Sequence, residues 1–130
     1  EAPQASADGK IDMSNDKFTI HYKQHRVTTD FAGAPCLLVY YDYSNNGSSA
    51  SSAMVDVNLQ AYQNGNLLEP AIPESDDEAI DQFMTEVQPG QAVTVCQAFT
   101  LQDESDVTLQ AGEAFSFGGG TIVSQVLKIK

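Results

Sequence analysis

Positive charge is scarce in this 130-residue chain. It has six Lys and Arg residues against 18 Asp and Glu residues, which gives a formal net charge of −12 and a pI near 4.1. Nucleic acid and anionic membrane surfaces repel such a chain at long range. We therefore expect no nucleic-acid partner for this acidic protein.

Long apolar runs and cysteines are also lacking. No stretch approaches the roughly 18 consecutive apolar residues that a membrane-spanning helix needs, so the sequence predicts no membrane span. The two cysteines are too few for a disulfide-stapled miniprotein, and they lack the spacing of zinc ligands. The length and the 42% content of hydrophobic residues indicate one globular domain of ordinary size.

Recognisable catalytic motifs are absent from the sequence. There is no GxSxG, and the glycine run 118–120 is followed by TIV rather than by Lys-Ser/Thr and a helix, so it is not a phosphate loop. His21 and His25 have the i, i+4 spacing of a helical metal site, but they lie in a predicted strand, where four residues span about 13 Å. The sequence therefore predicts no cofactor, no metal and no catalytic residues.

Alternation of apolar and polar residues dominates the chain from Lys17 onward, which is typical of half-buried strands. In the first strand, 17–27, Phe18, Ile20 and Tyr22 share one face. Further strands are predicted at 36–44, 54–63, 67–68, 91–101, 107–117 and 121–129, with an Asn64-Gly65 hairpin turn after the third. We expect an all-β fold, an immunoglobulin-like antiparallel β-sandwich of about seven strands; a closed barrel is the rival architecture.

One short helix is predicted before the fifth strand, within residues 75–87. Ser75 and Glu78 form a capping-box pattern, and an apolar stripe follows at helical spacing: Ile80, Phe83, Met84 and Val87. The acids of residues 74–81 could instead bind calcium, but the alternating Asp/Asn ligands and the central glycine of a calcium loop are missing. A solvated helix start is therefore the favoured interpretation.

Polar loops separate the predicted elements, and loops on a rigid scaffold commonly carry binding residues. The segments 45–52, 74–82 and 102–106 are the expected variable surfaces. The candidate interaction residues in them are Asn45, Asn46, Asp76, Asp77, Glu78, Asp103 and Glu104.

Cys36 begins the second predicted strand, and Cys96 lies in the strand after the helix. In an immunoglobulin-type order these strands are antiparallel neighbours, and by parity both cysteines point away from the core. An oxidising compartment favours a disulfide between them, which is the pairing that we expect. The alternative is two small thiols that each fill a gap.

Residues 1–16 hold mostly small and polar residues and lack the charged and apolar regions of a signal peptide. We interpret them as a flexible leader, and residues 17–130 as the folded domain. A mature exported protein begins in this way, and so does an ordinary cytosolic terminus.

Three segments resemble a bacterial family of domains of unknown function: VYYDYSNNGSSAS, LQAYQNGNLLEPA and VQPGQAVTVCQAFTLQDESDVTLQ. The resemblance covers residues 17–130. Its most specific features are Asn45-Asn46, the YQNG hairpin and the Pro89-Gly90 turn. It implies an exported, often lipid-anchored, immunoglobulin-like domain of Gram-positive gut and oral bacteria, with the leader as a spacer to a lipid-modified terminus lost with the signal peptide. It implies no catalytic residues.

We therefore expect a non-catalytic, extracellular module, attached to the cell surface, that acts as a monomer. Its expected role is to bind a protein or glycan of the envelope or host, or to support an envelope assembly. The alternative is a small secreted enzyme or enzyme inhibitor that acts through loops at one end of the sandwich. Turnover of hydrolase substrates would distinguish the two.

Overall fold

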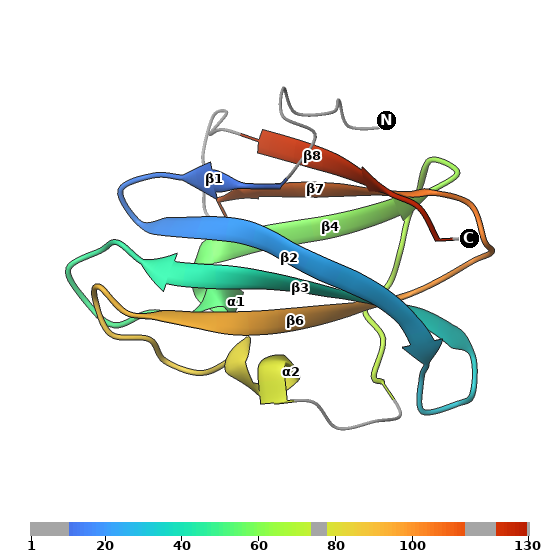
Figure 1. The fold of residues 1–130 in the computed structure, drawn as a ribbon, viewed down its shortest axis with the longest axis horizontal. Coiled ribbons are helices and arrows are strands. Elements are labelled where there is room, and N and C mark those ends of the chain that lie inside the picture. The colour runs from blue at the N-terminus through green and yellow to red at the C-terminus, as the bar shows by residue number, and fades with distance from the viewer. Residues whose placement is uncertain (1–10, 74–77, 114–121, 130) are drawn as a thin grey trace.

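Two antiparallel four-stranded sheets pack face to face in the computed structural model (Figure 1), which describes residues 11–73, 78–113 and 122–129. The first sheet has the order β1-β2-β3-β6, formed by β1 (Met13–Ser14), β2 (Phe18–Thr29), β3 (Pro35–Asn45) and β6 (Ala92–Thr100). The second has the order β5-β4-β7-β8, formed by β5 (Asn66–Leu67), β4 (Val57–Gln63), β7 (Val107–Glu113) and β8 (Ile122–Leu127). The predicted all-β sandwich is confirmed.

Each sheet is built around a central antiparallel pair. Strand β3 pairs with β2 and β6, and β7 pairs with β4 and β8. The predicted hairpin is also confirmed, because Gln63 pairs with Asn66 across the two-residue turn. Asn64 and Gly65 have φ values of 53° and 81°, and a type I′ turn requires positive φ at both positions.

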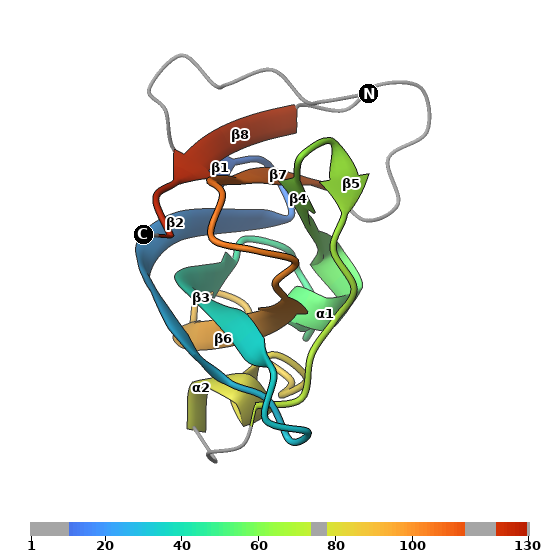
Figure 2. The ribbon, with the colours of Figure 1, turned by 90° about the vertical axis from the view of Figure 1, so that its right-hand side faces the viewer.

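The two sheets face each other (Figure 2), and the main core lies between them. Its large, fully buried side chains come from strands of both sheets and from the segment before β1: Ile11, Phe18, Ile20, Leu37, Tyr41, Tyr43 and Leu109. Residues 37, 39, 41 and 43 of β3 all face this core, as their alternation predicts. Burial of one such side chain contributes roughly 1.5–3 kcal/mol relative to exposure, so this layer holds the sheets together.

The alternation of side chains between the two faces of strand β2 reverses halfway along the strand. The register with β3 shifts between Tyr22, which pairs with Tyr41, and Gln24, which pairs with Tyr40. The extra residue, Lys23, reverses the alternation after it. His25, which pairs with Val39, therefore lies on the same face of β2 as Tyr22: its Nδ1 lies 2.5 Å from the Tyr22 hydroxyl, and its Nε2 lies 3.1 Å from the main-chain oxygen of Lys128.

The folded domain begins before the predicted boundary at Lys17. Ile11 is fully buried, Met13 is in the core, and Met13 pairs with Ile20 through strand β1. Asp12 Oδ1 accepts a hydrogen bond of 2.7 Å from the main-chain nitrogen of Tyr22. Residues 11–16 therefore belong to the sandwich rather than to a leader, while residues 1–10 lie outside the described residues.

Two short helices interrupt the strands. Helix α1 (Ala53–Asp56) occupies the start of a predicted strand, because the Ser52 hydroxyl accepts a hydrogen bond from the Val55 main-chain nitrogen and caps it. Helix α2 (Glu78–Gln82) lies where a helix is predicted but ends earlier, in turns at Phe83 and Met84. The predicted cap, Ser75, lies outside the described residues. No helix in the described ranges is long and apolar enough to cross a membrane.

Candidate binding site

The outer face of the first sheet carries a second, smaller apolar cluster. It contains Cys36, Leu38, Tyr40 and Cys96, whose side chains point away from the main core. The partly buried side chains that cover it come from α2, from the chain before it and from β6: Ala71, Ala79, Ile80 and Ala98. Figure 2 shows α2 alongside β6, at the edge of the sandwich. Both faces of this sheet are therefore covered near α2.

An apolar cavity of about 370 Å³ opens beside α2. The residues that line it come from β4, from the segment after β5, from α2 and the turn after it, and from β6: Leu59, Pro70, Ala71, Pro73, Ile80, Phe83, Met84, Cys96, Gln97, Ala98 and Phe99. Met84 is 61% exposed, so the cavity is open to solvent on its side. Gln97 is the one amide among these residues.

A buried tyrosine orients the Gln97 amide. The Tyr41 hydroxyl donates a hydrogen bond of 2.6 Å to Gln97 Oε1. Burial raises the pKa of the Tyr41 phenol well above its usual value, so it stays protonated and remains a donor. This bond assigns the oxygen of the amide to Tyr41, and Gln97 Nε2 makes no hydrogen bond within the described part of the chain.

The surroundings of the cavity are acidic. Glu69, Glu78, Asp81 and Glu86 are exposed in the segments that form its wall or flank them. The sequence contains no Lys, Arg or His between Arg26 and Lys128. The charged side chains nearest to the lining along the chain are therefore acids, whereas in space Arg26 Nε donates a hydrogen bond of 3.1 Å to the hydroxyl of Tyr40 in the neighbouring apolar cluster.

A more polar groove of about 430 Å³ lies on the other side of α2. It is lined by Lys23, Gln24, Tyr40, Glu78, Ala79, Gln82, Val93 and Thr94. Lys23 Nζ is 3.7 Å from Asp42 Oδ1, which also accepts a hydrogen bond of 2.6 Å from Thr94 Oγ1. Because Asp42 balances the charge of Lys23, this groove is a weaker candidate for binding an anion.

The predicted disulfide is wrong. Strands β3 and β6 are neighbours as expected, but Cys36 pairs with Thr100 and Cys96 pairs with Tyr40. The two cysteines are thus offset by four residues, about 13 Å along the strands, whereas bridged Cα atoms lie about 6 Å apart. Both are buried thiols. Burial, and to a lesser extent the Asp30 carboxylate, raises the pKa of the Cys36 thiol and makes it a poor nucleophile.

Protein prepared without reductant should therefore contain two thiols per chain. A maleimide should label both in denaturant and should label Cys36 slowly in the native state, since its side chain is fully buried. Intact-mass measurement before and after labelling checks this. If neither cysteine is labelled in non-reducing denaturant, the two cysteines form a disulfide after all.

Asn45 is a structural residue and not the surface contact that the sequence predicts. It is 1% exposed. Its amide nitrogen donates to the main-chain oxygens of Ser49 and Val87, both at 2.9 Å, and its Oδ1 accepts from the Gly47 nitrogen at 2.8 Å. Asn46 is exposed, and its amide donates to Asn15 O and Thr19 Oγ1. Its role in binding stays a prediction.

The predicted loop 102–106 is an exposed turn. Asp103 accepts hydrogen bonds from the Ser105 main-chain nitrogen and from Asn64 Nδ2, and the Ser105 bond lowers the pKa of its carboxyl. The Gln63 side chain holds this turn through the main chains of residues 102, 103 and 105. Glu104 is exposed beside it. Contact of Asp103 and Glu104 with a partner stays a prediction.

The acidic segment is described only in part. Glu78 is exposed at the start of α2, whereas Asp76 and Asp77 lie outside the described residues. Among the residues that the structure describes, no three His, Cys, Asp or Glu side chains gather as metal ligands.

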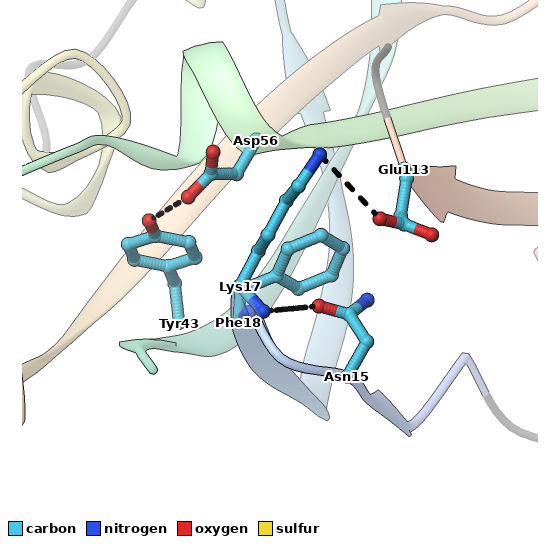
Figure 3. Close-up of polar contacts among 6 residues, drawn as sticks. All are labelled: Asn15, Lys17, Phe18, Tyr43, Asp56 and Glu113. Atoms are coloured by element: carbon cyan, nitrogen blue, oxygen red, sulfur yellow. Dashed lines mark hydrogen bonds and ion pairs between the residues drawn. The ribbon is translucent and has the colours of Figure 1, made fainter. Parts of the chain in front are cut away.

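Polar contacts tie β3 to α1, and the residue before β2 to β7 (Figure 3). The Tyr43 hydroxyl donates a hydrogen bond of 2.5 Å to Asp56 Oδ2, and Lys17 Nζ is 3.9 Å from Glu113 Oε1. Burial, reinforced by the bond to Asp56, raises the pKa of the Tyr43 phenol. A phenol that keeps its proton is a structural tie rather than a base or nucleophile near neutral pH.

The stability of the domain should fall above about pH 10. Tyrosines in the unfolded chain ionise near this value, whereas the pKa values of Tyr41 and Tyr43 are raised in the folded state. Their contribution is therefore complete below about pH 10 and is lost as the pH rises toward the folded pKa values. Urea unfolding across this range, with Tyr43→Phe expected to lessen the loss, checks the sign. A free energy of unfolding that does not fall above about pH 10 would contradict it.

Comparison with known proteins identifies a family and a shared fold. The family described as a domain of unknown function, DUF5067, matches residues 1–113. No curated protein matches the chain. Two solved structures of putative lipoproteins are similar: one from Staphylococcus aureus has a TM-score of 0.68 at 11% identity, over 97% of this chain and 91% of that one.

The second structure, from Bacillus subtilis, has a TM-score of 0.67 at 15% identity over 92% of this chain. The chain spans only 39% of the length of that protein. At these identities the two structures share the fold alone. The match to residues 1–113 confirms the resemblance seen in the sequence, and the chain belongs to DUF5067, a family of domains of unknown function.

Proposed function

We propose that this domain is a non-catalytic binding module of the cell envelope and that its partner binds in the apolar cavity beside α2. The cavity is the observation that carries this proposal. Its volume of about 370 Å³ falls within the roughly 300–1,000 Å³ typical of ligand sites. Its lining is apolar with one oriented amide, which is also the usual composition of such sites.

The chemistry of the cavity supports binding rather than catalysis. Its amide, Gln97, is neither an acid nor a base. The adjacent phenol, Tyr41, keeps its proton because burial raises its pKa. Among the described lining residues, the thiol of Cys96 is the one ionisable group.

We propose that the domain lies outside the cell and is attached to its surface. The support for this location is the similarity of its fold to two solved structures. The two similar structures belong to proteins described as putative lipoproteins, from Bacillus and Staphylococcus. The family resemblance of the sequence points the same way.

Capture from the native envelope tests the site. The purified domain should retain a partner, and Ala98→Leu should abolish retention by filling the cavity that Ala98 lines. Ala92→Leu is the matched control, because Ala92 is exposed at the start of the same strand and lies outside the cavity lining. Equal retention by all three proteins, or retention by none, would overturn the proposed site. Turnover in a panel of hydrolase substrates would overturn the non-catalytic role.

A further inference from the structure

The rings and sulfurs that line the cavity favour an aromatic occupant. Phe83 and Phe99 contribute rings, and Met84 and Cys96 contribute sulfur atoms. Aromatic pairs and sulfur–aromatic contacts both add to the free energy gained from apolar burial. Met84 is 61% exposed, and its flexible side chain has rotatable bonds that let it close over a planar side chain.

The side-chain amide of Gln97 favours a ligand that also carries a hydrogen-bond acceptor. Its oxygen is occupied by Tyr41, and its nitrogen has no acceptor among the described residues. A purely apolar ligand would take this donor away from water without replacing the lost hydrogen bond, which costs free energy. A carbonyl oxygen next to the aromatic group would satisfy it.

The acceptor on the ligand could be a carboxylate or a neutral carbonyl, and the charges near the cavity favour the neutral carbonyl. The exposed charges nearest to the lining in sequence are acids: Glu69, Glu78, Asp81 and Glu86. They repel a fatty acid or another anionic ligand and attract a ligand with basic groups on either side of its apolar part.

Resting on the proposed function, we infer that the partner is an extended peptide segment in which an aromatic residue is flanked by Lys or Arg. The aromatic side chain fills the cavity, and a main-chain carbonyl beside it accepts a hydrogen bond from Gln97 Nε2. The basic residues face the acids that flank the lining segments, Glu69, Glu78, Asp81 and Glu86. A lipid chain and an acidic peptide are the alternatives that the test must reject.

Titration with short blocked peptides tests whether the partner needs basic residues and an aromatic side chain. The probes are acetyl-Lys-Lys-Phe-Lys-Lys-amide, the same peptide with Ala in place of Phe, and the same peptide with Glu in place of every Lys. Calorimetry or amide chemical shifts should detect binding of the first alone. Ala98→Leu should abolish this binding, Ala92→Leu should leave it unchanged, and added salt should weaken it because the charges are exposed.

Gln97→Glu separates the hydrogen bond from the charge. The carboxylate still accepts the hydrogen bond of Tyr41, but it cannot donate to the peptide. If Gln97 acts as a donor, affinity for the Phe peptide should fall by roughly tenfold, the effect of one lost hydrogen bond with an unpaired acceptor. If only charge matters, the added negative charge should raise affinity. Gln97→Met, which has neither group, should also lower it.

Failure of the inference and failure of the proposed function give different results. Preference for the Glu peptide or for neutral phosphatidylcholine vesicles, or binding of none of these probes, overturns the basic aromatic peptide as partner. Cavity-dependent capture from the envelope would still stand in those cases. Unchanged affinity in both Gln97 variants overturns the role of the amide alone.

Discussion

Asn45→Asp should destabilise the domain by about 3 kcal/mol or more, although it changes one nitrogen atom to oxygen. The Asn45 amide donates to two main-chain oxygens, of Ser49 and Val87, in a buried position. Aspartate keeps the hydrogen bond from the Gly47 nitrogen, but it places a negatively charged oxygen against both carbonyls, and a buried charge that lacks a counter-ion costs several kcal/mol. Asn45→Ala should cost about 2 kcal/mol through the groups left unsatisfied. Urea unfolding of the three proteins checks the order.

The neighbouring asparagine is the matched control. Asn46 has the same side chain but is exposed, so water can replace its bonds to Asn15 and Thr19. Asn46→Asp should therefore cost less than about 1 kcal/mol, as most exposed substitutions do. Equal effects at the two positions would mean that residues 45–51 do not dock against Val87 as the structure shows.

Local sequence signals predicted the parts of the fold that depend on neighbouring residues. The alternation in 37–43 identified the core face of β3 because side chains of a strand alternate strictly between faces. Asn64-Gly65 identified its hairpin because these residues tolerate positive φ. The parity of Cys36 and Cys96 correctly placed both on the outer face of the first sheet.

Features that depend on distant contacts were not predictable in this way. The bulge at Lys23 reverses the facing of His25, and no residue type near it marks the shift. The four-residue offset between Cys36 and Cys96 is set by the register of β3 with β6, which parity leaves undetermined. Asn45 is a polar residue next to a loop, and its contacts with Val87, Gly90 and Gln91, which are distant in sequence, hold it in a buried position.

The cavity was missed, yet the sequence holds one signal for it. Residues 36–41, CLLVYY, are apolar on both faces of the strand, whereas the outer face of an uncovered antiparallel sheet is polar. This pattern indicates that other chain segments cover the outer face. Which segments do so depends on where residues 70–73 and α2 pack, and that arrangement leaves the space beside Gln97.

Ile11→Ala should destabilise the domain by about 3 kcal/mol, within the range measured when large buried aliphatic side chains are truncated. Ile11 is fully buried in the main core, and its main-chain nitrogen donates a hydrogen bond of 3.1 Å to Gln125 Oε1 on β8. The segment before β2 therefore joins the two sheets. Met54→Ala is the control, because Met54 is half exposed on α1 and should lose little. Equal urea midpoints for wild type and Ile11→Ala would instead support a leader that extends to residue 16.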